Sequence, residues 1–569
     1  MARVQKPSPT PTSASPDPAR GATRSPASDP DRRAWLLLGI AVALLYGLGL
    51  GRVDLWAPDE PRYGAIAEEL RSGRHGAAGW VLLHLNDEPY TQKPPLYFWL
   101  AAAAGAPGGR VDELAARLPS AVAGLVGVFL TAFIARVLVR DPRAALVAGG
   151  LLATSWRFVF TARRAQLDVL LTTLELVAIA LFAWLEWRRG GVEHARRRPL
   201  AIAGLHGSLG LAALVKGPVA WLPLLIFAAY LAAQRRARSF RAIAPAWAWL
   251  LSLAPLGLWI TAATALAPSG FAREAVGENV FGRFFAGTSH ARPIYYFLYQ
   301  LPVEFLPWTL LLPFAAKPLL QAARIVAPRT NATGASGTSG DGQSDRDGSP
   351  ATTRDRARFL LAWILVPFVF FSLSAGKRGL YLLPILPALA IAATLAGPLA
   401  RSASESAIGA MGTTARAWRR LSIAIALVGV LELALFGLVW PGLDARKSPR
   451  PIAEAAARHS ARDEAIGVYG LSPIEGGIAY YGDRRIASLR DEAALRDFLA
   501  AGGRLVVLRA RHQAQIGARL GLQPLATFRS GDRQLVLAHG AAIDPRRSDP
   551  PRDSGERPQG SPVGTAGAS

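Results

Sequence analysis

The chain has 569 residues, of which 51% are hydrophobic and 18% are charged, yet its formal net charge is +24. The positive charge lies in short loops between apolar runs. That pattern is typical of a membrane protein with arginine-rich cytoplasmic loops and argues against nucleic-acid binding. The chain has no cysteine, so disulfides and thiolate metal sites are excluded.

Residues 1–33 are rich in Pro, Ser, Ala and Arg and are predicted to be a disordered cytoplasmic N-terminus. The first apolar run, 34–50, lacks a small-residue cleavage site before Trp56, so we expect an uncleaved helix rather than a signal peptide. A span needs roughly 20 apolar residues. Eleven candidate spans within a transmembrane domain over 34–441 follow from this: 34–50, 114–138, 144–160, 166–187, 200–215, 218–234, 243–266, 296–320, 358–374, 380–398 and 421–441.

Arginine-rich loops set the predicted orientation. The positive-inside rule places four clusters in the cytoplasm: Arg136, Arg140 and Arg143; Arg188, Arg189, Arg196, Arg197 and Arg198; Arg235, Arg236, Arg238 and Arg241; and Arg416, Arg419 and Arg420. Two crossings must then lie between the second and third clusters, which makes Lys216-Gly217-Pro218 the tip of an external hairpin. The segments 51–113 and 267–295 become external loops, and 321–357 becomes a flexible cytoplasmic linker.

The composition turns soluble after the last span. Residues 446–540 are predicted to form a small extracytoplasmic α/β domain, with the C-terminus outside. We expect strands at 465–469, 503–508 and 534–538 and an amphipathic helix at 491–501. The tail, 541–569, is predicted to be disordered.

Polar residues of unusual type gather on the predicted external side. Asp59 and Glu60 stand beside the first span, where acids are costly to keep and are by default a functional-site hypothesis. The chain has 6 lysines against 58 arginines, and three of the six belong to this group. A lysine is a compact point charge that suits a phosphate oxygen. The remaining members are Arg62, Tyr90, Lys93, Asp168, Lys216, Glu278, His290, Lys377, Arg378 and Tyr381.

Each of these residues alone also has a structural explanation. Cations at helix ends anchor spans by snorkelling, Asp59 or Glu60 can cap the following helix, and Asp168 can be a helix-start acid. His290 can be structural and Tyr381 interfacial. Their convergence on one side of the membrane favours a shared site. Several cations around two carboxylates suit a phosphate-linked amphipathic substrate. Its leaving group is already an anion, so the chemistry requires only a base for an acceptor hydroxyl.

The ordered motifs resemble those of bacterial membrane glycosyltransferases of the GT-C fold that use polyprenyl-phosphate sugars. The pattern is similar to the lipid A aminoarabinose transferases and the protein O-mannosyltransferases. The segments that carry the resemblance are Asp59-Glu60-Pro61-Arg62-Tyr63, Tyr90 through Trp99, Gln166-Leu167-Asp168, Leu214-Val215-Lys216-Gly217-Pro218, Asn279 through Phe284 with His290 and Pro293, and Ser374 through Pro384. The likeness runs from the first span to the outer domain.

The resemblance implies a GT-C type polytopic α-helical membrane protein of about 11–13 transmembrane helices. It implies Asp59 as the base in an inverting displacement, with Glu60 and Asp168 as further catalytic carboxylates, Asp168 orienting the donor. The implied donor-phosphate ligands are Arg62, Lys93, Lys216, Lys377 and Arg378, with Tyr90 and Tyr381 shaping the pocket.

The resemblance also bears on a divalent metal. Family members of the aminoarabinose type carry a Glu just before the Lys-Pro-Pro segment, paired with a loop His on the metal. Here that position is Gln92, a neutral and poor ligand. His290 then lacks an obvious partner, unless Glu60, Asp87 or Glu88 takes that place. A metal cofactor is therefore left open.

The sequence thus predicts an integral inner-membrane enzyme with a periplasm-facing site. It would move a sugar from a polyprenyl phosphate to a hydroxyl or phosphate on an envelope lipid, glycan or protein, as in lipid A modification or protein glycosylation. One alternative is a transporter or lipid flippase, which predicts midplane ionisable residues and pseudo-symmetric halves; neither is found. A catalytically inactive scaffold that presents the outer domain is the other.

Overall fold

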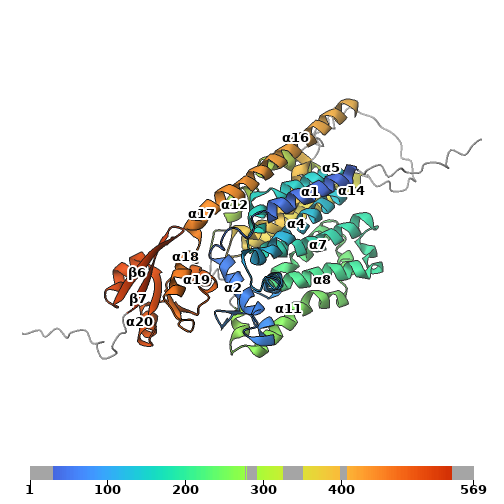
Figure 1. Cartoon of the computed structure of the whole chain (residues 1–569). Coiled ribbons are helices and arrows are strands. Elements are labelled where there is room, and N and C mark those ends of the chain that lie inside the picture. The colour runs from blue at the N-terminus through green and yellow to red at the C-terminus, as the bar shows by residue number, and fades with distance from the viewer. Residues whose placement is uncertain (1–29, 276, 278–290, 324–349, 397–406, 541–569) are drawn as a thin grey trace, which may run out of the picture.

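The computed structural model describes residues 30–275, 277, 291–323, 350–396 and 407–540. These residues form a bundle of apolar helices with a small α/β unit at one end (Figure 1). Residues Glu278 and His290 lie outside the described ranges.

The bundle contains the long apolar helices of the chain and several shorter ones. In chain order they are α1 (Pro30–Gly47), α4 (Glu113–Leu138), α5 (Pro142–Ala153), α6 (Trp156–Ala162), α7 (Leu167–Arg188), α8 (Pro199–Lys216), α9 (Leu222–Ala233), α10 (Phe240–Ile243), α11 (Ala246–Leu266), α12 (Tyr296–Glu304), α13 (Leu312–Ala322), α14 (Pro350–Leu373), α15 (Leu386–Ala393) and α16 (Ala407–Ala434). Short tight or wide turns connect or extend them: η2 (Val192–Arg197), η3 (Gly217–Trp221), η4 (Ala237–Ser239), η6 (Trp308–Leu311), η7 (Gly379–Ile385), η8 (Thr394–Ala396) and η10 (Leu435–Val439).

By length and composition, six described helical segments can cross a membrane, or eight if each of two bent pairs is one span. The bent pairs are α5 with α6, at 66°, and α12 with η6 and α13, at 105°. Over the residues that the structure describes, each of the eleven predicted spans is mainly helical, but the predicted count is larger than six to eight. The difference arises because α8 to α9 counts as one segment, and because neither α1 nor η7 with α15 is among the six.

The α8–α9 segment doubles back on itself, as the predicted external hairpin requires. Lys216 at the end of α8 pairs with Asp168 at the start of α7. Tyr230, near the end of α9, donates its hydroxyl to Glu186 near the other end of α7, at 3.0 Å. The backbone of Gly217, with φ 72° and ψ −145°, makes the reversal. Helices α8 and α9 therefore run in opposite directions.

Small residues let the helices approach closely. A side chain at Gly210 on α8 would collide with the carbonyl of Leu251 on α11, and a Cβ at Gly127 on α4 would lie 2.9 Å from the Thr173 hydroxyl on α7. Such close contact is how membrane helices gain packing energy without a hydrophobic driving force. Peripheral helices keep leucines outward, as Leu431 on α16 shows at 69% exposure, which suits contact with lipid.

The chain segment that connects α1 to α4 forms a compact layer at the end of the bundle that faces the α/β unit (Figure 1). It contains α2 (Asp59–Arg71), η1 (Gly76–Trp80), β1 (His84–Leu85), β2 (Glu88–Pro89) and α3 (Leu96–Gly105). Asn86 and Asp87 join β1 to β2 with φ of 60° and 65°. Two consecutive positive φ values are typical of the two-residue hairpin turn that matches strand twist.

The chain after α16 forms a five-stranded mixed sheet with helices on both faces. Its elements are α17 (Trp440–Lys447), α18 (Arg450–Arg458), β3 (Ile466–Tyr469), α19 (Ser472–Gly482), β4 (Ile486–Leu489), α20 (Glu492–Ala500), β5 (Leu505–Arg509), α21 (Ala510–His512), η11 (Gln513–Gly517), β6 (Leu522–Ser530) and β7 (Arg533–Gly540). The strand order is β4-β3-β5-β7-β6, with β4, β3 and β5 parallel and the other pairs antiparallel.

The three predicted strands and the predicted helix of this unit are confirmed as β3, β5, β7 and α20. Sequence reading missed β4 and β6. Strand β4 has the burial pattern of an edge strand, with only its first and last residues buried, so no continuous apolar run marks it. Strand β6 is buried only at its two ends and contains Pro524, which argues against a strand by composition.

The α/β unit docks on the layer that contains α2. Gly476 of α19 lies directly over the backbone of Arg62, where a Cβ would come within 2.8 Å of the Arg62 Cα. The Tyr480 hydroxyl donates to the Val111 carbonyl at 2.6 Å, and the Leu55 N–H donates to the Tyr481 hydroxyl at 2.6 Å. These contacts fix the unit beside the start of α2, which carries Asp59.

Candidate active site

Asp59 stands at the first position of α2 and is 8% exposed. Carboxylates are favoured at a helix N-terminus because the unpaired N–H groups there carry partial positive charge. Two guanidinium groups flank the Asp59 carboxylate: Arg62 lies 3.5 Å away, one turn along the same helix, and Arg378 lies 3.3 Å away. The Asp59 carboxylate thus lies between one cation of its own helix and one from a distant segment.

Arg378 brings the segment after α14 into this group. Burial by itself would lower the pKa of the Arg378 guanidinium, but the nearby Asp59 and Asp168 carboxylates raise it above its ordinary value. The charges of Asp59 and Asp168 therefore both act on the Arg378 guanidinium, which places the two acids in one neighbourhood.

Asp168 at the start of α7 forms an ion pair with Lys216 at the end of α8. The Lys216 ammonium also lies 5.0 Å from the centre of the Tyr381 ring, in a cation–π contact. Since the short Asp168 side chain is on a rigid helix, this pair fixes the direction of the long Lys216 side chain. The structure therefore brings together four predicted residues: Asp168, Lys216, Arg378 and Tyr381.

The Lys-Pro-Pro segment approaches from the β1–β2 hairpin. Arg62 donates to the Gln92 side-chain oxygen at 3.2 Å, which ties α2 to this segment. Tyr90 is buried and packs edge-on against Phe98, with ring centres 5.9 Å apart. Lys93 directly follows Gln92 and is half-buried. Arg62 therefore connects Asp59 with the segment that carries Tyr90 and Lys93.

Lys377 differs from its neighbour Arg378. Its ammonium donates to the Arg292 carbonyl at 3.1 Å and to the Ser374 carbonyl. Burial lowers the pKa of the Lys377 ammonium. In this structure Lys377 ties together the backbone around Arg292 and Ser374, and Arg378 is the residue of the pair that reaches Asp59.

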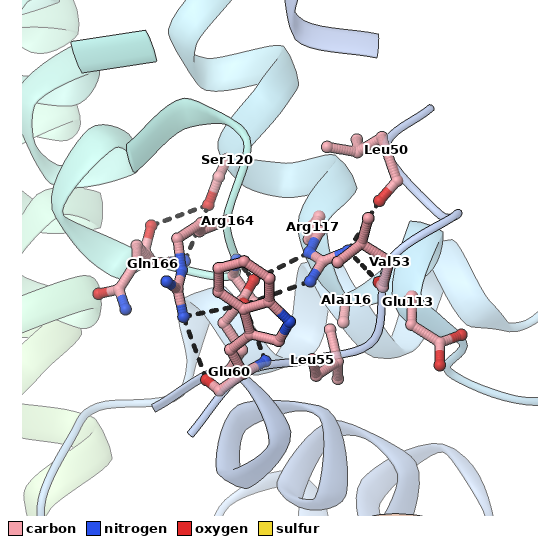
Figure 2. Close-up of polar contacts among 12 residues, drawn as sticks. Leu50, Val53, Leu55, Glu60, Glu113, Ala116, Arg117, Ser120, Arg164 and Gln166 are labelled. Atoms are coloured by element: carbon pink, nitrogen blue, oxygen red, sulfur yellow. Dashed lines mark hydrogen bonds and ion pairs between the residues drawn. The ribbon is translucent and has the colours of Figure 1, made fainter. Parts of the chain in front are cut away.

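Glu60 faces the protein interior and is 1% exposed (Figure 2). Its carboxylate lies 2.9 Å from Arg117 on α4 and 3.0 Å from Arg164, and it accepts the Trp56 and Ala165 N–H groups. Burial alone would raise the pKa of Glu60, but Arg117 and Arg164 lower it to about 2. These contacts fix the start of α2, which orients the adjacent Asp59.

Sequence reasoning assigned no role to three residues of this region: Arg117, Arg164 and Tyr63, the last of which it named only as part of the Asp59–Tyr63 motif. Arg117 and Arg164 hold Glu60, and Tyr63 packs against Phe98 on the same helix face as Asp59, with ring centres 5.5 Å apart. Burial and the charges of Asp59 and Tyr90 raise the pKa of the Tyr63 hydroxyl. The signal for Arg117 was present, because a cation inside a predicted span normally has a buried partner.

The metal pair implied by the resemblance does not fit this chain. Gln92 offers a neutral amide oxygen, which already accepts a hydrogen bond from Arg62. His290 lies outside the described residues, and Glu60 is fully engaged by Arg117 and Arg164. Neither Gln92 nor Glu60 therefore supplies the anionic ligand of the implied metal pair.

The side chains of the site carry more positive than negative charge. Two carboxylates, Asp59 and Asp168, face the cations Arg62, Lys216 and Arg378, with Lys93 adjacent in sequence to Gln92. Such an arrangement stabilises an anion that bears more than one negative charge, such as a phosphate, and leaves one carboxylate available to accept a proton.

Comparison with known proteins agrees with the sequence motifs. Residues 33–272 match the family described as dolichyl-phosphate-mannose-protein mannosyltransferase. An undecaprenyl phosphate-alpha-4-amino-4-deoxy-L-arabinose arabinosyl transferase from Pseudomonas paraeruginosa is 32% identical over 371 residues, which cover 63% of this chain and 59% of that protein. A related transferase from Pseudomonas fluorescens is 32% identical over 394 residues, covering 66% of this chain and 60% of the relative. The chain thus spans about three fifths of these relatives.

Two solved structures share the fold. The chain matches ArnT from Cupriavidus metallidurans bound to undecaprenyl phosphate with a TM-score of 0.68 and 21% identity, over 88% of this chain and 98% of that one. The archaeal oligosaccharyltransferase AglB from Archaeoglobus fulgidus gives a TM-score of 0.53 and 13% identity, over 84% and 69%. The matches confirm the predicted resemblance and the GT-C fold class. The chain is a multi-pass membrane protein of that fold with a C-terminal α/β unit.

Proposed function

We propose that this protein is an inner-membrane glycosyltransferase that moves a sugar from a polyprenyl phosphate to an envelope lipid. The observation that carries the proposal is the Asp59 carboxylate, held between Arg62 and Arg378 at a helix N-terminus. The Asp168–Lys216 pair lies in the same neighbourhood. Similarity to arabinosyl transferases supports undecaprenyl phosphate-linked 4-amino-4-deoxy-L-arabinose as the donor. The motif resemblance to lipid A aminoarabinose transferases supports a lipid A-like glycolipid as the acceptor.

The reaction needs one bond formed and one broken. An acceptor hydroxyl oxygen attacks the anomeric carbon as its proton passes to the Asp59 carboxylate. The bond from that carbon to the phosphate oxygen breaks on the opposite face, so the configuration inverts. The polyprenyl phosphate leaves with one more negative charge, which Arg62, Lys93 and Arg378 stabilise. No general acid is required, because this leaving group is already an anion.

If the acceptor group were a phosphate, Asp59 would have a different role in the same site. A phosphate oxygen is already a nucleophilic anion, so Asp59 would orient Arg62 and Arg378 rather than take a proton. Loss of the Asp59 charge would then cost less than with a hydroxyl acceptor. The two acceptor types are thus distinguishable by their dependence on Asp59.

Two further carboxylates have supporting roles in this proposal. Asp168 fixes the Lys216 ammonium against the Tyr381 ring, so that the donor is oriented before reaction. Glu60 is a positioning residue, because both its oxygens are occupied by Arg117, Arg164 and backbone N–H groups. It acts by holding Asp59 at the start of α2.

The placement of charge supports a periplasm-facing site. Asp168 and Lys216 lie at one end of α7, and Glu186 with Arg236 lies at the other. Helix α7 has 22 residues, which is about 33 Å, enough to cross the hydrocarbon core. Since the arginine-rich loops belong in the cytoplasm, the opposite end with Asp168 faces outward.

The proposal is tested by mass spectrometry of envelope lipids from a strain that lacks this chain, with and without complementation. We expect a sugar-modified lipid to disappear on deletion, to return with the wild-type chain and to stay absent with Asp59→Asn. Restoration by Asp59→Asn would rule out Asp59 as an essential base and would point to an acceptor phosphate or to a scaffold. Unchanged lipid glycosylation on deletion would overturn the proposal, and altered lipid distribution without a glycosylation change would favour the flippase.

A further inference from the structure

Three metal-ligating side chains lie together at the far end of α2, away from Asp59. His75 Nε2 is 3.4 Å from a Glu69 carboxylate oxygen and 3.6 Å from an Asp87 carboxylate oxygen. All three ligand atoms lie within 4.8 Å of one another. Glu69 is buried, while His75 and Asp87 are half-buried. The group combines one imidazole with two carboxylates from α2, the loop after it and the β1–β2 turn.

The spacing fits a tetrahedral metal ion. Zinc bonds to nitrogen and oxygen are about 2.0–2.1 Å long, so two ligands of a tetrahedral ion stand about 3.3 Å apart. The separations of 3.4 and 3.6 Å from His75 to the two acids are close to this value. Imidazole with carboxylate oxygens suits zinc and similar divalent transition metals. Three protein ligands also leave a fourth position open, as in many zinc sites.

Neighbouring groups already orient these ligands. The Asn86 and Asp87 N–H groups donate to the two Glu69 oxygens, which fixes that carboxylate against the hairpin turn. The His75 ring stacks on His84 with centres 3.7 Å apart. Outer contacts of this kind hold metal ligands in their binding geometry.

A purely ionic explanation also exists, because Asp87 lies 3.9 Å from Arg74 and 3.5 Å from Arg485. Both distances exceed the roughly 2.7–2.9 Å of a strong charge-assisted bond. Both arginines are also largely exposed. These arginines line a pocket of about 290 Å³ together with Glu69 and Asp87. Through this pocket, water and small ions can reach Glu69 and Asp87.

We propose that Glu69, His75 and Asp87 bind a divalent transition-metal ion, zinc by preference, at a site separate from the Asp59 centre. The ion would join the end of α2 to the β1–β2 turn. The Asn86 side chain in that turn also exchanges two hydrogen bonds with the Ile486 backbone of edge strand β4. The metal therefore clamps the hairpin that leads into Tyr90 and secures the docking of the C-terminal sheet.

The test uses the full-length chain purified in detergent, stripped of metal and titrated with Co²⁺ as a spectroscopic probe of the zinc site. We expect one equivalent to give the visible absorption of a four-coordinate Co²⁺ ion, and Zn²⁺ to displace it. His75→Ala should weaken binding by more than about 100-fold, and Asp87→Asn should weaken it without removing a buried group.

His194→Ala and His290→Ala are the controls. His194 is an exposed residue in a predicted cytoplasmic loop, and His290 is the loop histidine that the resemblance assigns to a metal. Both should bind Co²⁺ as the wild type does. Absence of saturable Co²⁺ binding to a wild-type chain that elutes as a single folded species would overturn the proposal. Wild-type Co²⁺ affinity in folded Asp87→Asn and His75→Ala would overturn it too. So would loss of Co²⁺ binding in His290→Ala alone.

Discussion

The guanidinium of Arg378 lies 3.3 Å from the carboxylate of Asp59, although 319 positions separate the two residues in the chain. Asp59 belongs to α2, and Arg378 belongs to the loop between α14 and η7. This ion pair therefore positions both the proposed base, Asp59, and a proposed phosphate ligand, Arg378. The chemistry therefore depends on how α14 is placed relative to α2.

Arg378→Ala should lower kcat/KM for sugar transfer by about 100- to 1,000-fold, because a preorganised donor to the developing phosphate charge is lost. Arg378→Lys should recover only part of this loss, since an ammonium cannot reproduce the planar fork of the guanidinium. The measurement is transfer kinetics in detergent with a synthetic polyprenyl-phosphate sugar. Arg420→Ala, an exposed residue of α16, is the matched control and should react at the wild-type rate.

Glu60→Gln should destabilise the fold rather than alter chemistry directly. Removal of the charge leaves Arg117 and Arg164 buried beside a neutral amide, and breaking a buried ion pair from one side costs about 3–5 kcal/mol. Thermal unfolding in detergent measures the effect. Glu492→Gln removes a surface acid with two arginine partners and should lower the melting temperature far less than Glu60→Gln does. Equal melting temperatures for the two variants would contradict the positioning role of Glu60.

The same carboxyl predicts a loss of stability in acid. The pKa of Glu60 is lowered from 4.5 to about 2 in the folded protein, so the unfolded chain binds its proton first. Its contribution is therefore complete above pH 4.5 and is lost as the pH falls towards 2. The shift corresponds to about 3 kcal/mol. Melting curves between pH 6 and pH 3 should show this loss in the wild type and a weaker slope in Glu60→Gln.

Asp168 and Lys216 should act as a unit. Because the two side chains form an ion pair, Asp168→Asn and Lys216→Ala should show a coupling energy of about 0.5–3 kcal/mol in a double-mutant cycle. The quantity to measure is kcat/KM for the donor. A control cycle between Asp168→Asn and Arg420→Ala should be additive. Additivity in the first cycle as well would show that the pair has no joint role.

Much of the site neighbourhood was predictable from sequence. The membrane restricts charged groups to the two ends of each apolar run, and the arginine-rich loops identify one of those ends. Asp59, Asp168, Lys216 and Arg378 were therefore assigned to a single face. The structure brings them together through the two ion pairs and the effect of both acids on Arg378.

What sequence could not supply was the direction of each side chain. Lys377 and Arg378 are adjacent, and only the backbone path decides that Lys377 turns to carbonyl oxygens and Arg378 to Asp59. Glu60 looked as reactive as Asp59, because its partners Arg117 and Arg164 come from other segments. Single-sequence patterns report period and charge, whereas such pairings depend on tertiary packing.

The most direct measurement compares Asp59→Asn with the wild type for sugar transfer to a hydroxyl acceptor and for binding of the polyprenyl phosphate product. We expect turnover to fall by about 100- to 10,000-fold, while product affinity changes little, because Arg62, Lys93 and Arg378 remain. Asp532→Asn, in the exposed turn between β6 and β7, serves as the control for a lost carboxylate. Turnover by Asp59→Asn at the wild-type rate would remove Asp59 as the base and contradict the proposed mechanism.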